Sequence, residues 1–141
     1  MQLLAAALVV AALNANPAII AQQGGRLTPV EATMSEKLTP ELALMIYQRC
    51  AAFFSARSLL LTTHQAERAE ARAVATANAF RVGAARLAEK YQIDLGETAM
   101  ETTLEGMIGD YIEEFALSGN ATGIVVTGTL KADHDFCMSL D

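Results

Sequence analysis

The two cysteines are the residues of this sequence with the clearest chemistry. Cys50 lies inside a long apolar stretch, Cys137 lies near the end of the sequence, and neither has a CxxC partner. In an oxidising compartment two such thiols most simply form one disulfide, so we predict a Cys50–Cys137 bridge. In the chain-entropy model, closing a loop of this length stabilises a fold by roughly 4 to 5 kcal/mol. The alternative is a reactive or metal-binding thiol, which would need a lowered pKa or clustered ligands.

The densest polar cluster, Asp133-His134-Asp135, carries side chains of the kinds that bind divalent ions. A metal site needs three or four convergent ligands, however, and neighbouring residues on a helix or loop point in different directions. We therefore expect Asp133 to cap a short terminal helix and His134 to be exposed. The other histidine, His64, falls near an expected helix start, and nothing in the sequence brings it to His134.

Other candidate groups have simpler structural explanations. Met100 and Met107 have heptad spacing on an apolar face, where methionine commonly fills a core. Glu101 and Glu105 share a helical face, which favours a solvated surface over an acid/base pair. The sequence contains no CxxCH, GxSxG or SxxK motif and no glycine-rich phosphate loop. We expect no cofactor and no bound metal, and a non-enzymatic protein.

The stretch from Thr39 to Leu61 is predicted to be the central helix. Thr39 is placed to cap its start and Pro40 follows at the first helical position. Apolar residues recur at helical steps and define one broad face, with Arg49 and Arg57 toward its margins. The members of that face are Leu42, Met45, Ile46, Cys50, Phe53, Leu59 and Leu60.

Two further long helices are predicted. Thr62 and Gln65 have capping-box spacing and would start an alanine-rich helix over roughly 64–91, with one continuous helix over 40–91 as the alternative. Its narrow apolar side would let a neighbouring helix approach closely. Asp94 and Glu97 would cap a third helix that ends near Ser118, before Gly119 and Asn120.

Seven acids and no Lys or Arg lie between positions 94 and 114. The second helix carries more bases than acids, so the two helices are electrostatic complements and are expected to be neighbours. The acids also define a possible face for a partner. This predicted acidic face consists of Glu97, Glu101, Glu105, Asp110, Glu113 and Glu114.

The run over 121–129 is rich in Gly and β-branched residues and predicts an extended connection. A short terminal helix would follow, bearing Phe136, Cys137 and Leu140. The predicted fold is all-α: a small antiparallel bundle of three main helices plus a short C-terminal helix, stapled by one disulfide.

The first 21 residues are predicted to be a signal peptide. The uncharged apolar run over 3–13 is too short to span a bilayer as a helix, and cleavage is expected near Ala21. No Lys or Arg precedes this run, so an uncleaved anchor or a misassigned start codon is the alternative. Residues 22–38 would form a flexible leader and 39–141 the helical domain, exported to the periplasm or the outside.

A formal net charge of −6 argues against nucleic acid or an anionic membrane as the main partner. The leading hypothesis is an exported interaction protein whose acidic face docks a basic protein, in the manner of an inhibitor or immunity protein. The alternative is a protein that binds a small molecule or a divalent metal. The sequence does not indicate an oligomeric state.

Overall fold

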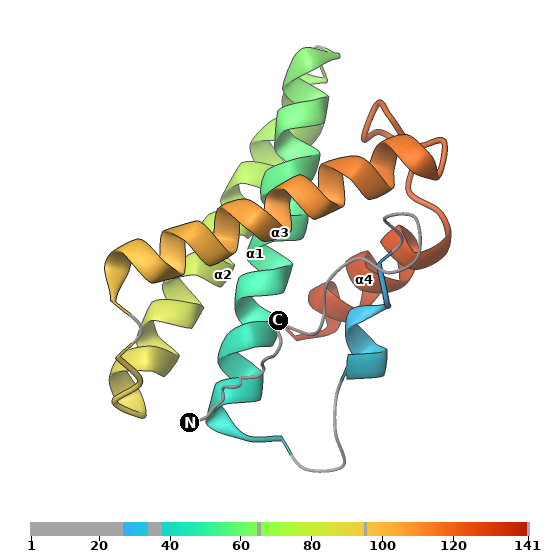
Figure 1. The fold of residues 1–141 in the computed structure, drawn as a ribbon. Coiled ribbons are helices and arrows are strands. Elements are labelled where there is room, and N and C mark those ends of the chain that lie inside the picture. Colours follow the sequence, from blue (N-terminus) through green and yellow to red (C-terminus); the bar gives the residue numbers. More distant parts are fainter. Residues whose placement is uncertain (1–26, 34–37, 65, 95, 141) are drawn as a thin grey trace.

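The computed structural model describes residues 27–33, 38–64, 66–94 and 96–140, and all regular structure in these ranges is helical. A 3₁₀ helix, η2 (Val30–Thr33), precedes α1 (Pro40–Thr63), α2 (Glu67–Lys90), α3 (Glu97–Leu117) and α4 (Gly128–Ser139). The three long helices pack together and the short α4 lies beside them (Figure 1). The predicted all-α bundle of three main helices, a short C-terminal helix and one disulfide is confirmed.

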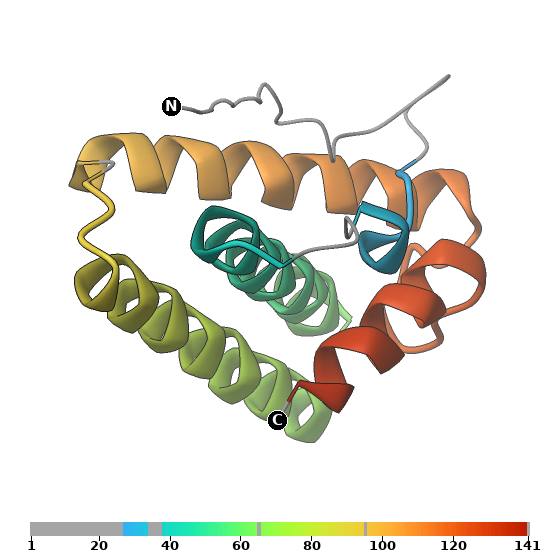
Figure 2. The same cartoon turned by 90° about the horizontal axis from the view of Figure 1, so that it is seen from below.

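α1 is the central helix of the fold. Viewed nearly along its axis, α2, α3 and α4 lie on different sides of it (Figure 2). Every residue over 48–56 is buried, so α1 is enclosed around its circumference in this part. The sequence predicts a single apolar face. The burial is more complete because residues 50–56 carry no charge and offer apolar or small side chains in every direction.

The two ends of α1 depend on threonine hydroxyls. Thr39 Oγ1 accepts a hydrogen bond from the amide of the third helical residue at 3.1 Å, as predicted. The hydroxyls of Thr62 and Thr63 donate to carbonyl oxygens one turn back, so they belong to the last turn of α1. The predicted capping box that starts the second helix is therefore wrong, and so is the continuous helix over 40–91. Gln65 lies outside the described residues.

α2 runs back along α1 and packs against it (Figure 1). Its buried residues are Ala73, Ala77, Phe80 and Ala84, which follow the predicted apolar side. The two helices approach closely at Gly83, where a Cβ atom would lie only 2.6 Å from the nearest Tyr47 ring carbon. Tyr47 itself packs edge-on against Phe80, with ring centroids 5.5 Å apart. The absence of a side chain at position 83 thus allows the aromatic contact between the two helices.

α3 crosses α1 obliquely on the side away from α2 (Figures 1 and 2). The N-cap is Gly96, with φ 73°, and the Asp94 carboxylate accepts from the Gly96 amide at 3.1 Å instead of forming the predicted capping box. At the other end Gly119 adopts φ 80° and the Asn120 amide donates to the Phe115 carbonyl at 2.8 Å. This is the predicted left-handed helix stop.

The buried line of α3 agrees with the sequence. Leu104, Met107, Tyr111 and Phe115 are all buried against the core. Because α1 lies between α2 and α3 over much of their length, the opposite charges of α2 and α3 do not pair (Figure 2). No ion pair joins these two helices among the described residues, so the predicted electrostatic pairing is wrong.

The connection before α4 spans 121–127 and contains turns and bends, so the predicted extended run over 121–129 is wrong, and α4 begins at Gly128 rather than at Asp133. Arg57 on α1 holds this connection. Its Nε donates to the Gly123 carbonyl at 2.8 Å and its Nη2 to the Ile124 carbonyl at 3.2 Å. The guanidinium of Arg57 therefore donates hydrogen bonds to two successive backbone carbonyls of this connection.

Residues 27–33 differ from the flexible leader that the sequence predicts. Leu27 and Val30 are buried, and η2 packs against α4. The remaining part of the leader and the predicted signal peptide over 1–21, with its cleavage near Ala21, are not among the described residues. The packed core thus begins before the first long helix.

Gly83→Ala should destabilise the protein although alanine is the better helix former. The new methyl group would overlap the Tyr47 ring, so either the ring or α2 must shift, and we expect a loss of about 1 to 3 kcal/mol. Gly106→Ala is the matched control, because a Cβ there meets nothing within 4 Å. It should stabilise by about 0.5 to 1 kcal/mol. Urea unfolding of both variants checks this; equal effects at both positions would contradict the close approach.

Candidate functional site

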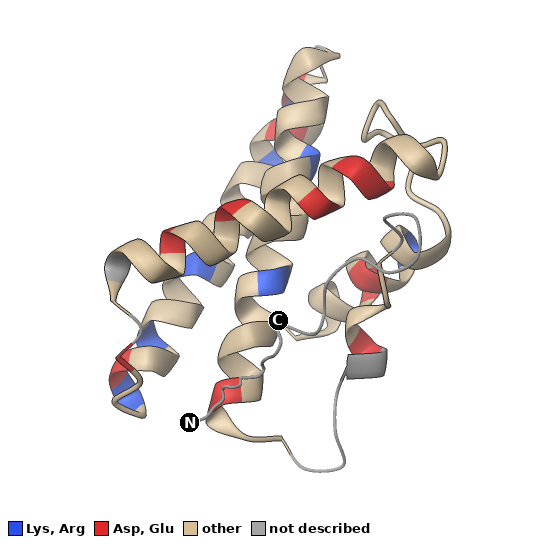
Figure 3. Cartoon of the chain, viewed as in Figure 1, with Lys and Arg blue, Asp and Glu red and all other residues tan. Residues whose placement is uncertain are grey.

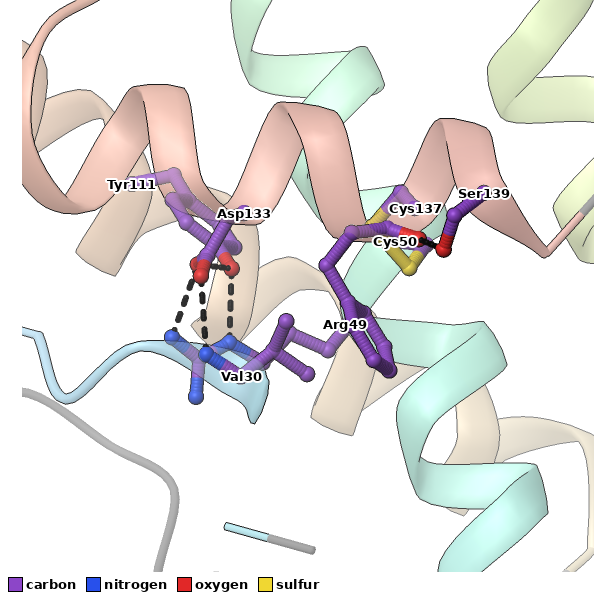
Figure 4. The surroundings of a disulfide bond; sticks show 8 residues. Val30, Arg49, Cys50, Tyr111, Asp133, Cys137 and Ser139 are labelled. Atoms are coloured by element: carbon purple, nitrogen blue, oxygen red, sulfur yellow. Dashed lines mark hydrogen bonds and ion pairs between the residues drawn. A yellow bond between two sulfur atoms is a disulfide. The ribbon is translucent and has the colours of Figure 1, made fainter. Parts of the chain in front are cut away.

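The predicted disulfide links the middle of α1 to α4 (Figure 4). Cys50 and Cys137 are joined with their Cα atoms 5.7 Å apart, and both residues are fully buried. Neither thiol is free, so the alternative of a reactive or metal-binding cysteine does not apply to this structure. The bond fixes α4 beside the centre of α1.

A buried polar cluster of Arg49, Tyr111 and Asp133 lies next to the disulfide (Figure 4). Arg49 Nη2 forms an ion pair with Asp133 Oδ2 at 2.9 Å, and Arg49 Nε donates to the Tyr111 hydroxyl at 2.6 Å. The Tyr111 hydroxyl donates in turn to Asp133 Oδ2 at 2.5 Å. Arg49 is 1 % exposed and Asp133 is not exposed at all. The cluster therefore joins α1, α3 and α4 in the interior.

The same cluster also holds the segment before α1. The Val30 amide donates to Asp133 Oδ1 at 2.8 Å, and Arg49 Nη2 donates to the Thr28 carbonyl. Both carboxylate oxygens of Asp133 are thus engaged. This explains why residues 27–33 are packed, since their backbone supplies partners to a buried ion pair.

The surroundings of Arg49 and Tyr111 shift the pKa of each side chain upward. Burial acts to lower the pKa of Arg49, but Tyr111 and Asp133 outweigh it and the pKa is raised. Burial raises the pKa of Tyr111 well above its usual value, with Arg49 acting in the opposite direction. Tyr111 therefore stays a neutral hydrogen-bond donor. A fully paired cluster without access to solvent has a structural role, not an acid/base role on a substrate.

Both charged members of this cluster lie elsewhere than the sequence predicts. The sequence predicts Asp133 as the cap of the terminal helix and Arg49 at a margin of α1, but Asp133 is inside α4 and both residues are buried. One signal was present in the sequence. Asp133 precedes Cys137 by four residues and Arg49 precedes Cys50 by one, so the predicted disulfide, combined with a longer α4 than the sequence predicts, places the two charges close together.

The two histidines are not brought together. The His134 ring contacts Phe53 and Phe54, with centroid distances of 6.2 and 5.8 Å, and is half-buried rather than exposed as predicted. The exposed His64 lies at the C-terminal end of α1, about 15 Å further along the helix axis than Phe54. In the described parts of the chain, no three His, Cys, Asp or Glu side chains are grouped to hold a metal ion.

The predicted acidic face divides into several environments. Figure 3 shows acidic positions along α3 and no basic ones. Glu101, Glu105 and Glu113 are exposed. Glu114 belongs to the interior, at 2 % exposure, and its Oε1 accepts from the Leu27 amide at 3.2 Å. Glu114 therefore cannot contact a partner, and the side chain of Glu97 lies outside the described part of the structure.

Asp110 is half-buried on the flank of α3 nearest the buried cluster. Burial raises its pKa first, the charge of Glu113 raises it further, and Arg49 acts in the opposite direction. No ion pair joins Asp110 to a described Lys or Arg. The carboxylate is therefore held in an environment that disfavours its charge.

A cavity of about 440 Å³ lies between α1, α2, α3 and the α2–α3 connection. We call it the α1–α2–α3 groove. Its polar lining residues are Gln48, Arg81, Asp94 and Glu101, and most of the other lining side chains are alanine and larger aliphatic residues. The sequence did not indicate this groove, because its four polar residues come from four separate segments.

None of the helices in the described ranges is long and apolar enough to cross a membrane. No protein-family model matches this chain, and comparisons with curated proteins and with solved structures give no significant match.

Asp133→Ala should be strongly destabilising, because it leaves the Arg49 guanidinium buried without its counter-charge. We expect a loss of about 3 to 5 kcal/mol in the free energy of unfolding. Asp135→Ala is the control: this exposed carboxylate pairs with Lys131 at 2.8 Å, and its removal should cost less than about 1 kcal/mol. The double variant Arg49→Met/Asp133→Leu should be more stable than Asp133→Ala, because it removes both charges. A double variant less stable than Asp133→Ala would show that the buried charge does not cause the destabilisation of Asp133→Ala.

Asp110→Asn should slightly stabilise the protein near neutral pH. The pKa of Asp110 is raised in the folded protein. At pH values just above the ordinary Asp pKa of about 3.9, the folded protein therefore binds more protons than the unfolded chain, and the free energy of unfolding decreases as the pH rises. Asparagine does not titrate, so the variant lacks this decrease in the free energy of unfolding. Its advantage, at most about 0.5 kcal/mol after solvent screening, should be present at neutral pH and disappear toward acid pH. Urea unfolding across a pH series would detect it, and an advantage that instead grew on acidification would contradict this explanation.

Proposed function

We propose that this protein is a non-enzymatic interaction module, and that an outward ridge of α3 binds a basic segment of a partner protein. The ridge consists of Glu105, Gly109 and Glu113, which are four residues apart and all exposed. The carrying observation is that neither glutamate of the ridge forms an ion pair with a described Lys or Arg. Their charges are available to an external cation.

The glycines of α3 support this proposal. Glycine in a helix interior costs roughly 1 kcal/mol relative to alanine, and a Cβ atom at Gly106 or Gly109 would meet nothing within 4 Å. The packing of the free protein therefore gives no reason for either glycine. A partner whose backbone approaches α3 closely would give one, since a side chain at these positions would obstruct it.

The interior of the protein supports a binding role over a catalytic one. The buried ionisable groups of the Arg49–Asp133 cluster are paired with each other and with backbone groups, and the two histidines lie apart. What the fold presents outward is a rigid helix anchored to α1 through Leu104, Met107, Tyr111 and Phe115. Export to an oxidising compartment is part of the proposal, and the Cys50–Cys137 disulfide is compatible with it.

The test is capture of partners by the immobilised protein from an extract of its native host at low salt. A partner counts if it is basic, is retained by the wild type and is released as salt is raised. Glu105→Lys/Glu113→Lys should weaken its binding by about tenfold or more, because two favourable charge pairs become repulsive. The matched control, Glu67→Lys/Glu89→Lys, makes the same change in net charge at exposed positions of α2 and should retain the partner.

Gly109→Ala gives a second, independent readout. This variant should be more stable than the wild type and yet bind the partner less well, because the methyl group adds helix propensity and also occupies the contact surface. Equal loss of the partner with both charge-reversal variants, or no protein retained at low salt, would refute the ridge as a docking surface.

A further inference from the structure

We propose that the α1–α2–α3 groove binds a short apolar peptide with free termini, of the size of a dipeptide. This site is separate from the outward ridge of α3 and does not depend on the partner proposed for it. The cavity volume of about 440 Å³ falls within the range of about 300 to 1,000 Å³ that small-molecule sites occupy.

The floor of the groove carries an unpaired buried amide. Gln48 on α1 lines the groove and is only 7 % exposed, yet its side chain forms no hydrogen bond with any described residue. A buried polar group without a partner is costly, and an amide has both a donor and an acceptor to satisfy. A peptide group offers the complementary acceptor and donor, so a ligand of this chemistry would satisfy both halves of the Gln48 amide.

The walls of the groove carry opposite charges. Arg81 stands on the α2 side, where its Nη2 donates to Ser55 Oγ at 3.1 Å, and the remaining donors of its guanidinium have no described hydrogen-bond partner. Glu101 on α3 and Asp94 in the α2–α3 connection are exposed and mark the mouth. A carboxylate would therefore be favoured at Arg81 and an ammonium group near Glu101 and Asp94.

The rest of the lining is apolar. Ala51 and Leu104 contribute to the interior side of the groove, with Met100 and Ile93 closer to its mouth. Methionine adapts well to differently shaped apolar ligands. A zwitterion with a central amide and an aliphatic side chain matches all three features of the groove: the amide of the floor, the charges of the walls and the apolar lining.

The experiment is a titration of the isotope-labelled full protein with alanyl-leucine, followed by NMR. The side-chain NH₂ resonances of Gln48 should shift, with a dissociation constant below the millimolar range. N-acetyl-alanyl-leucine, which lacks the ammonium group, and alanyl-leucine amide, which lacks the carboxylate, should each bind about tenfold more weakly, a difference of about 1.4 kcal/mol. Free leucine, which lacks the peptide group, should also bind more weakly than alanyl-leucine.

Two variants separate binding from a structural role. Gln48→Met should raise the melting temperature of the free protein, because it removes an unpaired buried amide, and should weaken alanyl-leucine binding at least about tenfold. A structural role would instead lower the melting temperature. Arg81→Met should weaken binding and abolish the preference for a free carboxylate. Arg86→Met, at an exposed position of α2 outside the groove, should do neither.

The proposal is overturned if millimolar alanyl-leucine leaves the Gln48 amide resonances unmoved. It is also overturned if binding is unchanged in Gln48→Met and Arg81→Met, since the peptide would then occupy another place. Glu105→Lys/Glu113→Lys should leave peptide binding intact, so failure of the groove and failure of the ridge are distinguishable.

Discussion

The buried Arg49–Asp133 ion pair is the interaction on which the arrangement of this protein depends. Two charges without solvent contact are tolerated only when their remaining hydrogen-bonding capacity is satisfied. Here that requirement recruits the Tyr111 hydroxyl, the Val30 amide and the Thr28 carbonyl, so four segments distant in sequence converge on one point. The ion pair and its backbone partners therefore connect α4 and the segment before α1 to one point of α1.

The disulfide and the ion pair act on the same two helices by different means. The Cys50–Cys137 bond restricts the unfolded chain and sets the distance between α1 and α4. The ion pair, adjacent to it along both helices, sets their orientation and also reaches α3 and η2. Together they connect α1, α3, α4 and η2 in the interior of the protein.

α3 shows how one helix with a single sign of charge can serve different purposes. Glu114 faces inward and accepts a backbone amide, Glu101 lies at the mouth of the groove, and Glu105 and Glu113 face solvent. The acidic run is therefore not one surface. Its division follows from the helical period: residues one turn apart share a direction, while neighbours such as Glu113 and Glu114 point to different sides.

The three long helices, the disulfide and the apolar lines of α2 and α3 are predictable from the sequence, because they depend on local periodicity and on the presence of only two cysteines. The buried Asp133–Arg49 pair, the interior position of Glu114 and the place of Gln48 in a groove are visible only once the helices are packed. Each of these facts depends on which distant segment supplies a partner. Local propensity is equally compatible with Asp133 at a helix start. A carboxylate can accept hydrogen bonds either from the free amides of a helix start or from a buried guanidinium. Only the packing of α4 against α1 selects between these two positions for Asp133.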